Sequence, residues 1–215
     1  MSMTIEQALE ALQSGNQRFV SGKPLRPHTD KERLRKCLEG QHPFACILAC
    51  SDSRVPVDLI FDTGVGDLFV VKVPGNVFGD EEIGSAEYAL EHLAVPLLVV
   101  MGHNDCGMVK TVFENGALEG RLNAISKKIL LAVEAVKSAE AASDQLGKPI
   151  SSTVDRAART NVWNAIQDAL VMSPIIASRV KQGSCRVLGA FYWINNGEVE
   201  WLGEHPQQEE IFRSF

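Results

Sequence analysis

The sequence predicts an α/β fold in which helices flank a mostly parallel central sheet. Four continuous apolar runs, each bounded by turn residues, have the length of strands that are buried on both faces. Segments whose apolar residues recur at helical spacing lie between these runs. The turn signal Asn195-Asn196-Gly197 predicts a hairpin. We therefore expect about four parallel strands and one antiparallel edge strand.

Residues 1–40 are predicted to form an N-terminal helical arm. Thr4 begins a capping-box pattern at the start of a first helix. Residues 21–27 contain a glycine and two prolines, which are typical of a linker. Thr29 begins a second capping-box pattern, which predicts a short helix.

Residues 41–215 are predicted to form the α/β core, so that residues 1–215 make up a single domain. The predicted strands span residues 44–49, 68–73, 95–101, 186–194 and 199–202. The predicted helices span residues 82–93, 107–114, 122–136 and 154–180, with an interruption at Ser173-Pro174. A polar stretch of small residues at 138–152 predicts a loop.

Composition excludes several classes of protein. The 215 residues include 21 Lys and Arg against 27 Asp and Glu, and the formal net charge of −6 argues against binding to nucleic acid or to an anionic membrane. The N-terminus lacks the pattern of a signal peptide, and the longest apolar run, 94–101, is far too short to span a membrane. The five cysteines are an odd number for a disulfide framework. We expect a soluble, cytoplasmic protein with reduced thiols.

Polar side chains that can bind metal follow the first predicted strand. Cys50, Asp52 and Arg54 are spaced by two residues. If the chain stays extended there, a thiol, a carboxylate and a guanidinium all point to the same side. In open parallel sheets, ligands bind just beyond the carboxyl ends of the strands, which is where these residues are expected.

The third apolar run ends in a second group of this kind. His103 and Cys106 are three residues apart, a spacing at which a tight turn can bring both side chains onto one ion. Together with Cys50 they offer two thiolates and one imidazole, a strong ligand set for zinc. Three protein ligands leave a fourth position open, as in catalytic zinc sites. Cys106 is also expected to begin a helix whose positive end favours the thiolate.

Each of these features alone has an ordinary explanation, such as a core cysteine, a turn histidine or a surface ion pair. Their joint placement at two strand ends favours a site. The other cysteines are interpreted as ordinary residues without a bridge: Cys37, Cys46 and Cys185. The other histidines have no ligand partner at short spacing and are expected to be exposed non-ligands: His28, His42, His92 and His205.

Three segments of the chain resemble the β-class carbonic anhydrases. They are ACSDSRVP (49–56), IFDTGVGDLFVVKVPGN (60–76) and GHNDCGMVK (102–110). The resemblance implies one Zn²⁺ per subunit, bound by Cys50, His103 and Cys106. It also implies a catalytic pair, Asp52 and Arg54, and a homodimer or homotetramer. Thr63, Lys72 and Pro74 depart from the residues that are common in the family.

The function that this resemblance implies is the reversible hydration of CO₂ to bicarbonate and a proton. In this hypothesis zinc-bound hydroxide attacks CO₂, Asp52 orients the hydroxide, and Arg54 holds Asp52 ionised and away from the metal. Two alternatives stay open. The same hydroxide could hydrolyse carbonyl sulfide or carbon disulfide, or Asp52 could close a structural zinc site in a non-catalytic protein.

Overall fold

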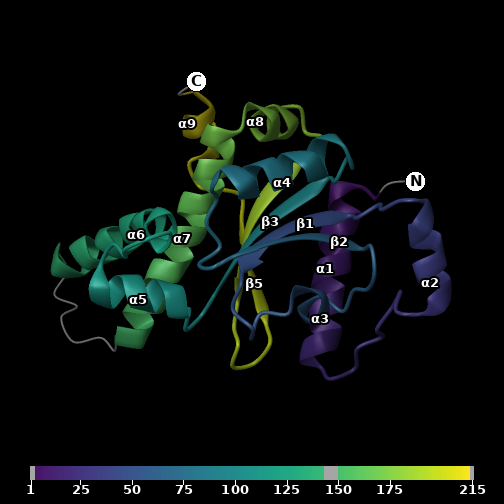
Figure 1. Cartoon of the computed structure of the whole chain (residues 1–215), viewed down its shortest axis with the longest axis horizontal. Coiled ribbons are helices and arrows are strands. Elements are labelled where there is room, and N and C mark those ends of the chain that lie inside the picture. The colour runs from purple at the N-terminus through teal and green to yellow at the C-terminus, as the bar shows by residue number, and fades with distance from the viewer. Residues whose placement is uncertain (1–2, 143–149, 214–215) are drawn as a thin grey trace.

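A five-stranded sheet forms the centre of the structure, a computed structural model in which residues 3–142 and 150–213 are described (Figure 1). The strands are β1 (Ala45–Cys50), β2 (Leu68–Val73), β3 (Leu97–His103), β4 (Arg186–Tyr192) and β5 (Val199–Gly203). They are arranged in the order β2-β1-β3-β4-β5. The first four strands run parallel and β5 pairs antiparallel with β4. The predicted fold class is confirmed.

Helices cover both faces of this sheet (Figure 1). They are α1 (Ile5–Val20), α2 (Lys31–Lys36), α3 (Val57–Ile60), α4 (Asp80–Glu91), α5 (Gly107–Asn115), α6 (Leu122–Ala142), α7 (Ile150–Met172), α8 (Pro174–Lys181) and α9 (Gln208–Arg213), with a 3₁₀ turn, Cys37–Glu39, after α2. Across the two described ranges, none of the helices combines the length and the apolar character needed to cross a membrane.

Alternate residues of the buried strand β1 point to opposite faces of the sheet, as the period of two requires. Ile47 packs in the apolar cluster that includes α1 and α3. Cys46, Leu48 and Cys50 pack in the cluster that includes α4, α7 and α8. All six residues of β1 are buried, which explains why the sequence shows a continuous apolar run rather than alternation. The thiol of Cys50 therefore lies on the face that α7 covers.

Helix α1 begins at the predicted capping box, in which the Thr4 hydroxyl accepts from the backbone N–H of Gln7. Its buried Asn16 joins the helix to distant parts of the chain. The Asn16 side chain donates to the carbonyls of Ile60 and Gly197 and accepts from the N–H of Val199. These bonds fix α1 on the sheet face opposite α7.

Two buried carboxylates in the loop before β2 hold the segment between α1 and α2. Asp62 accepts from the Arg18 guanidinium and from the backbone N–H groups of Leu25 and Arg26. Burial alone would raise the pKa of Asp62, but these three donors hold it below the ordinary value of 3.8. Asp67, the second carboxylate, contacts His28 of that segment and pairs with Arg33 of α2.

The local boundaries differ from the prediction at several points. Helix α2 is capped by Asp30, whose side chain accepts from the N–H of Arg33, so the prediction of Thr29 as the cap is wrong. The loop predicted at 138–152 is wrong for the described residues at its ends, because α6 continues to Ala142 and α7 begins at Ile150. Residues 143–149 of that prediction lie outside the described part.

Candidate metal centre

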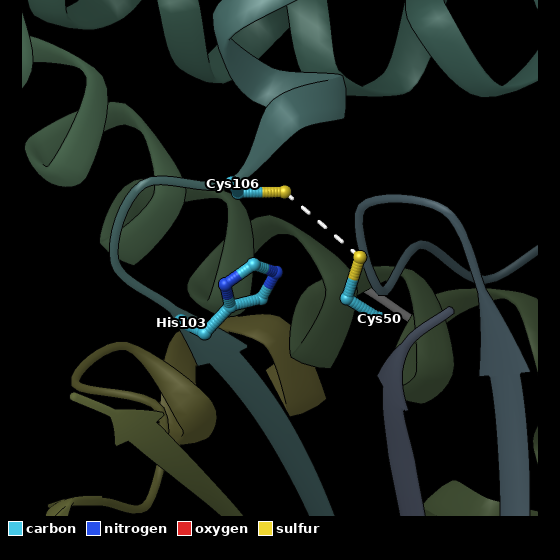
Figure 2. Close-up of side chains that lie close together, drawn as sticks. All are labelled: Cys50, His103 and Cys106. Carbon is cyan, nitrogen blue, oxygen red and sulfur yellow. Dashed lines mark hydrogen bonds between the residues drawn. The ribbon is translucent and has the colours of Figure 1, made fainter. Parts of the chain in front are cut away.

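The three predicted metal ligands meet at the carboxyl ends of the neighbouring strands β1 and β3. Cys50 is the last residue of β1, His103 is the last residue of β3, and Cys106 caps the N-terminus of α5. Figure 2 shows the two sulfur atoms facing each other, with the imidazole ring of His103 beside them. The ligand atoms of the three residues all lie within 4.8 Å of one another, and all three residues are buried.

The geometry of these side chains fits a zinc ion. The Sγ atoms of Cys50 and Cys106 are 3.9 Å apart, and two thiolates on a tetrahedral zinc are separated by about 3.8 Å at ordinary Zn–S lengths. His103 Nδ1 lies 2.9 Å from the carbonyl oxygen of Asn104. The buried Nε2 atom of His103 has no hydrogen-bond partner among the described residues. A proton on Nδ1 leaves the Nε2 lone pair free for a metal.

The two thiols differ in acidity because they share a hydrogen bond. The bond from Cys106 is the largest cause that lowers the pKa of Cys50, and the N–H groups of Gly75 and Asp52 act in the same direction. The same bond raises the pKa of Cys106, and burial adds to that effect. Backbone N–H groups at the start of α5 do act on Cys106, as predicted, but they are outweighed. The shared hydrogen bond therefore favours ionisation of Cys50 over ionisation of Cys106.

A tight turn, rather than an extended strand, brings Asp52 and Arg54 together. The backbone N–H of Arg54 donates to Asp52 Oδ1, and the N–H of Val55 donates to the Asp52 carbonyl. The chain does not stay extended beyond Cys50, because β1 ends at that residue, so the condition for the three side chains to share one side is not met. The Arg54 guanidinium donates from Nε to Asp52 Oδ1 at 3.0 Å and from Nη2 to Oδ2 at 2.8 Å. This pair holds the pKa of Asp52 at about 2.

Arg54 also reaches the loop between the other two ligands. Its Nη1 donates to Asp105 Oδ2 and its Nη2 donates to the Asp105 carbonyl, both at 2.9 Å. Asp105 has a φ of 50°, which is uncommon for a residue with a Cβ. The Asp155 carboxylate of α7 accepts from the Asp105 N–H at 2.8 Å. The sequence did not single out Asp105 and Asp155, because no short spacing connects them to the ligands.

The Cys50 sulfur accepts two backbone N–H groups, from Gly75 at 3.2 Å and from Asp52 at 3.4 Å. Gly75 lies in the turn after β2 with a φ of 75°. A Cβ at this position would come within 2.4 Å of Ile129 Cδ1 on α6. Only glycine combines this backbone conformation with such close packing.

The remaining cysteines and histidines lie outside this centre. All five cysteines are free, and burial raises the pKa of the Cys46 and Cys185 thiols. The structure brings none of the other four histidines into the ligand group. His205 is buried against the Trp163 ring, so the expectation that it is exposed is wrong.

Two of the residues that depart from the family pattern make bonds to the backbone. The Thr63 hydroxyl donates to the carbonyl of Asp58. Lys72 donates from Nζ to the carbonyl of Val55 at 2.8 Å, which ties β2 to the loop after Asp52 and Arg54. Lys72 therefore supports the loop beside the centre, and Thr63 supports the turn after α3.

An α/β sheet that carries a buried Cys₂His cluster at the ends of two adjacent parallel strands defines a candidate metalloenzyme. The family model described as carbonic anhydrase matches residues 45–199. "Carbonic anhydrase 2" of Mycobacterium tuberculosis is 36% identical over 196 residues, which cover 89% of this chain and 90% of the relative. "Carbonic anhydrase" of Mycolicibacterium smegmatis is 33% identical over 201 residues, which cover 90% and 91%.

Solved structures agree with these relatives. The β-carbonic anhydrase CafA of Aspergillus fumigatus superposes with a TM-score of 0.73 at 26% identity, covering 96% of this chain and 95% of that one. A structure described among two tetrameric β-carbonic anhydrases of Sordaria macrospora gives a TM-score of 0.70 at 27% identity, with coverage of 91% and 96%. The chain belongs to the β-carbonic anhydrase family. This assignment supports a carbonate dehydratase (lyase) activity.

Proposed function

We propose that the protein hydrates CO₂ to bicarbonate and a proton at a zinc ion bound by Cys50, His103 and Cys106. The observation that carries this proposal is the buried cluster of two sulfur atoms and one unpartnered imidazole nitrogen, within reach of a single ion. Zinc bound there would act as a Lewis acid that lowers the pKa of a water molecule toward neutrality.

Asp52 is the proposed acceptor that orients the reacting water. Its Oδ1 atom already accepts two N–H groups of Arg54, whereas Oδ2 accepts one, from Nη2. A carboxylate oxygen accepts about two hydrogen bonds, so Oδ2 retains a lone pair that can accept from water. The low pKa of Asp52 keeps this carboxylate ionised, and therefore an acceptor, throughout the neutral range.

Arg54 is proposed to keep Asp52 in this position. A bidentate guanidinium–carboxylate pair fixes the plane of the carboxylate as well as its place. The further bonds from Arg54 to Asp105 tie that pair to the loop that carries His103 and Cys106. These contacts favour the enzyme over the alternative in which Asp52 closes a structural zinc site.

The assembly is proposed to be a homodimer or a homotetramer, with one zinc per subunit and CO₂ or bicarbonate as the small-molecule partner. Tetrameric β-carbonic anhydrases among the structural relatives support an oligomer. We propose that the protein binds neither nucleic acid nor a membrane. We also propose that it is cytoplasmic. The formal charge of −6 supports the first of these statements.

Zinc content and CO₂ hydration, measured on one preparation, test this function. We expect one zinc per chain and hydration well above background at about pH 8.5, above the pKa near 7 of an activated water. Cys50→Ser is expected to lose both zinc and activity, and Asp52→Asn to keep zinc and lose activity. Asp168→Asn, which changes a carboxylate that is paired with Lys128 and is not part of the ligand group, is the matched control.

A zinc-replete, reduced protein without hydration above background would contradict the proposal. Turnover of carbon disulfide in place of CO₂ on that preparation would instead support the hydrolase alternative. Unchanged hydration in Asp52→Asn would remove the proposed role of the carboxylate while leaving the metal site intact.

A further inference from the structure

The turn after β2 connects the sulfur of Cys50 to a buried asparagine on α7. Asn161 donates from Nδ2 to the carbonyl oxygen of Gly75 at 2.7 Å. Gly75 in turn donates its N–H to Cys50 Sγ at 3.2 Å. Asn161 is 1% exposed and lies 86 residues from Gly75 along the chain. We infer that Asn161 is a positioning residue for the metal centre, which holds Gly75 so that its N–H stays directed at the Cys50 sulfur.

The position of Asn161 relative to the centre is fixed by close packing of α7 on β3. Gly102 precedes the ligand His103, and a Cβ there would come within 2.7 Å of Val162 Cγ2 and 3.4 Å of the Ala158 carbonyl oxygen. The helix therefore lies against the backbone of the strand that carries a ligand. Because interiors packed this closely leave little room for adjustment, Asn161 is held at a fixed distance from the site.

Hydrogen bonds hold the turn on two sides. Gly75 has a φ of 75°, a conformation that glycine leaves as readily as it enters. The neighbouring N–H of Asn76 donates to the carbonyl of Val73, which closes the turn on the strand side. Asn161 supplies the bond on the opposite side. Loss of the Asn161 amide removes this bond from the buried Gly75 carbonyl, and we expect the turn to shift so that the Gly75 N–H is directed less well at the Cys50 sulfur.

The expected consequence is a change in how the sulfur binds metal. N–H groups that donate to a thiolate stabilise its negative charge and orient its sulfur lone pairs. Loss of such outer partners typically weakens metal affinity by about 10- to 100-fold. This inference rests on the proposed zinc site. It adds to that site a residue that neither carries a ligand atom nor lies near a ligand in the sequence.

The test measures zinc affinity, by competition with a chromogenic chelator, and the sulfur-to-metal charge-transfer band of the Co²⁺-substituted protein. Asn161→Leu and Asn161→Asp both remove the donor, at similar side-chain size. We expect each to weaken zinc binding by about 10- to 100-fold and to shift or weaken the charge-transfer band. If Asn161→Leu and Asn161→Asp do not fold, the same readouts are measured on Asn161→Ser, whose side chain is too short to reach Gly75.

Asn16→Leu is the matched control, because Asn16 is also a buried asparagine that donates to backbone carbonyls, but on the sheet face opposite α7. It is expected to lower the melting temperature without a change in zinc affinity or in the Co²⁺ spectrum. Zinc affinities of the Asn161 variants within about twofold of wild type would overturn the inference, as would an equal loss in Asn16→Leu. A wild-type chain that binds no zinc would instead contradict the proposed function, and the inference with it.

Discussion

Replacing Gly75 by alanine tests how tightly the turn beside Cys50 is packed. The backbone φ of 75° costs a residue with a Cβ about 1–2 kcal/mol. The new methyl group would also lie 2.4 Å from Ile129 Cδ1, and overpacking of this kind costs about 1–3 kcal/mol. We therefore expect Gly75→Ala to lower the free energy of unfolding by about 2–5 kcal/mol.

The overlap between the new methyl group and Ile129 can be relieved separately from the backbone cost. Ile129→Val removes the Cδ1 atom and alone costs about 0.5–1.5 kcal/mol. In the double variant the overlap disappears while the φ penalty remains, so we expect about 1–3 kcal/mol of favourable coupling between the two changes. Urea unfolding at fixed protein concentration, with a chelator present, measures all four proteins. Additivity within about 0.5 kcal/mol would refute the packing argument.

Three further predictions concern the ion pair, the metal and pH. Arg54→Gln is expected to slow CO₂ hydration by about 100-fold or more, while zinc content stays at one per chain, because Asp52 loses its bidentate partner. Removal of zinc by a chelator is expected to abolish hydration and lower the melting temperature, and added zinc to restore both. Asp62→Asn is expected to lower the free energy of unfolding at pH 7, by an amount that shrinks as the pH falls below about 4. The reason is that a carboxylate with a depressed pKa stabilises the fold above its unfolded pKa and loses this effect as it becomes protonated.

Each of these outcomes has a control or a contrary result. Arg186→Gln removes an arginine that pairs with Glu6 and Glu204, and should leave hydration unchanged. A chelated protein that still hydrates CO₂ would contradict a role for zinc. A stability difference for Asp62→Asn that stays constant from pH 7 to pH 3 would show that the charge of Asp62 does not contribute.

The sheet could be predicted because its central strands are buried on both faces. Such strands appear in the sequence as unbroken apolar runs, and β1 and β3 are buried along their whole length. The metal ligands could be predicted for a related reason. Cys50 and His103 end two of these runs, and parallel strands bring their carboxyl ends to one edge of the sheet.

The supporting residues could not be predicted because their partners are distant in the sequence and bond through the backbone. Asn161 meets Gly75 across 86 residues, and Asp155 meets the N–H of Asp105 across 50. A backbone carbonyl or N–H group has no side-chain identity that a pattern could reveal. The turn at Asp52 was missed for a local reason. The Asp52 carboxylate accepts from the N–H of Arg54, two residues later, and such a local bond competes with the extended strand.

The strand order has a consequence for when the metal centre forms during folding. Cys50 ends β1, whereas His103 ends β3 and Cys106 begins α5, and the chain completes β2 and α4 between β1 and β3. Pairing of β1 with β3 closes a loop of about fifty residues, a step whose entropic cost precedes any gain from the metal. Zinc binding by all three residues therefore reports that β1 and β3 are already paired, and a chain that stalls before this pairing has only one of the three ligands in place.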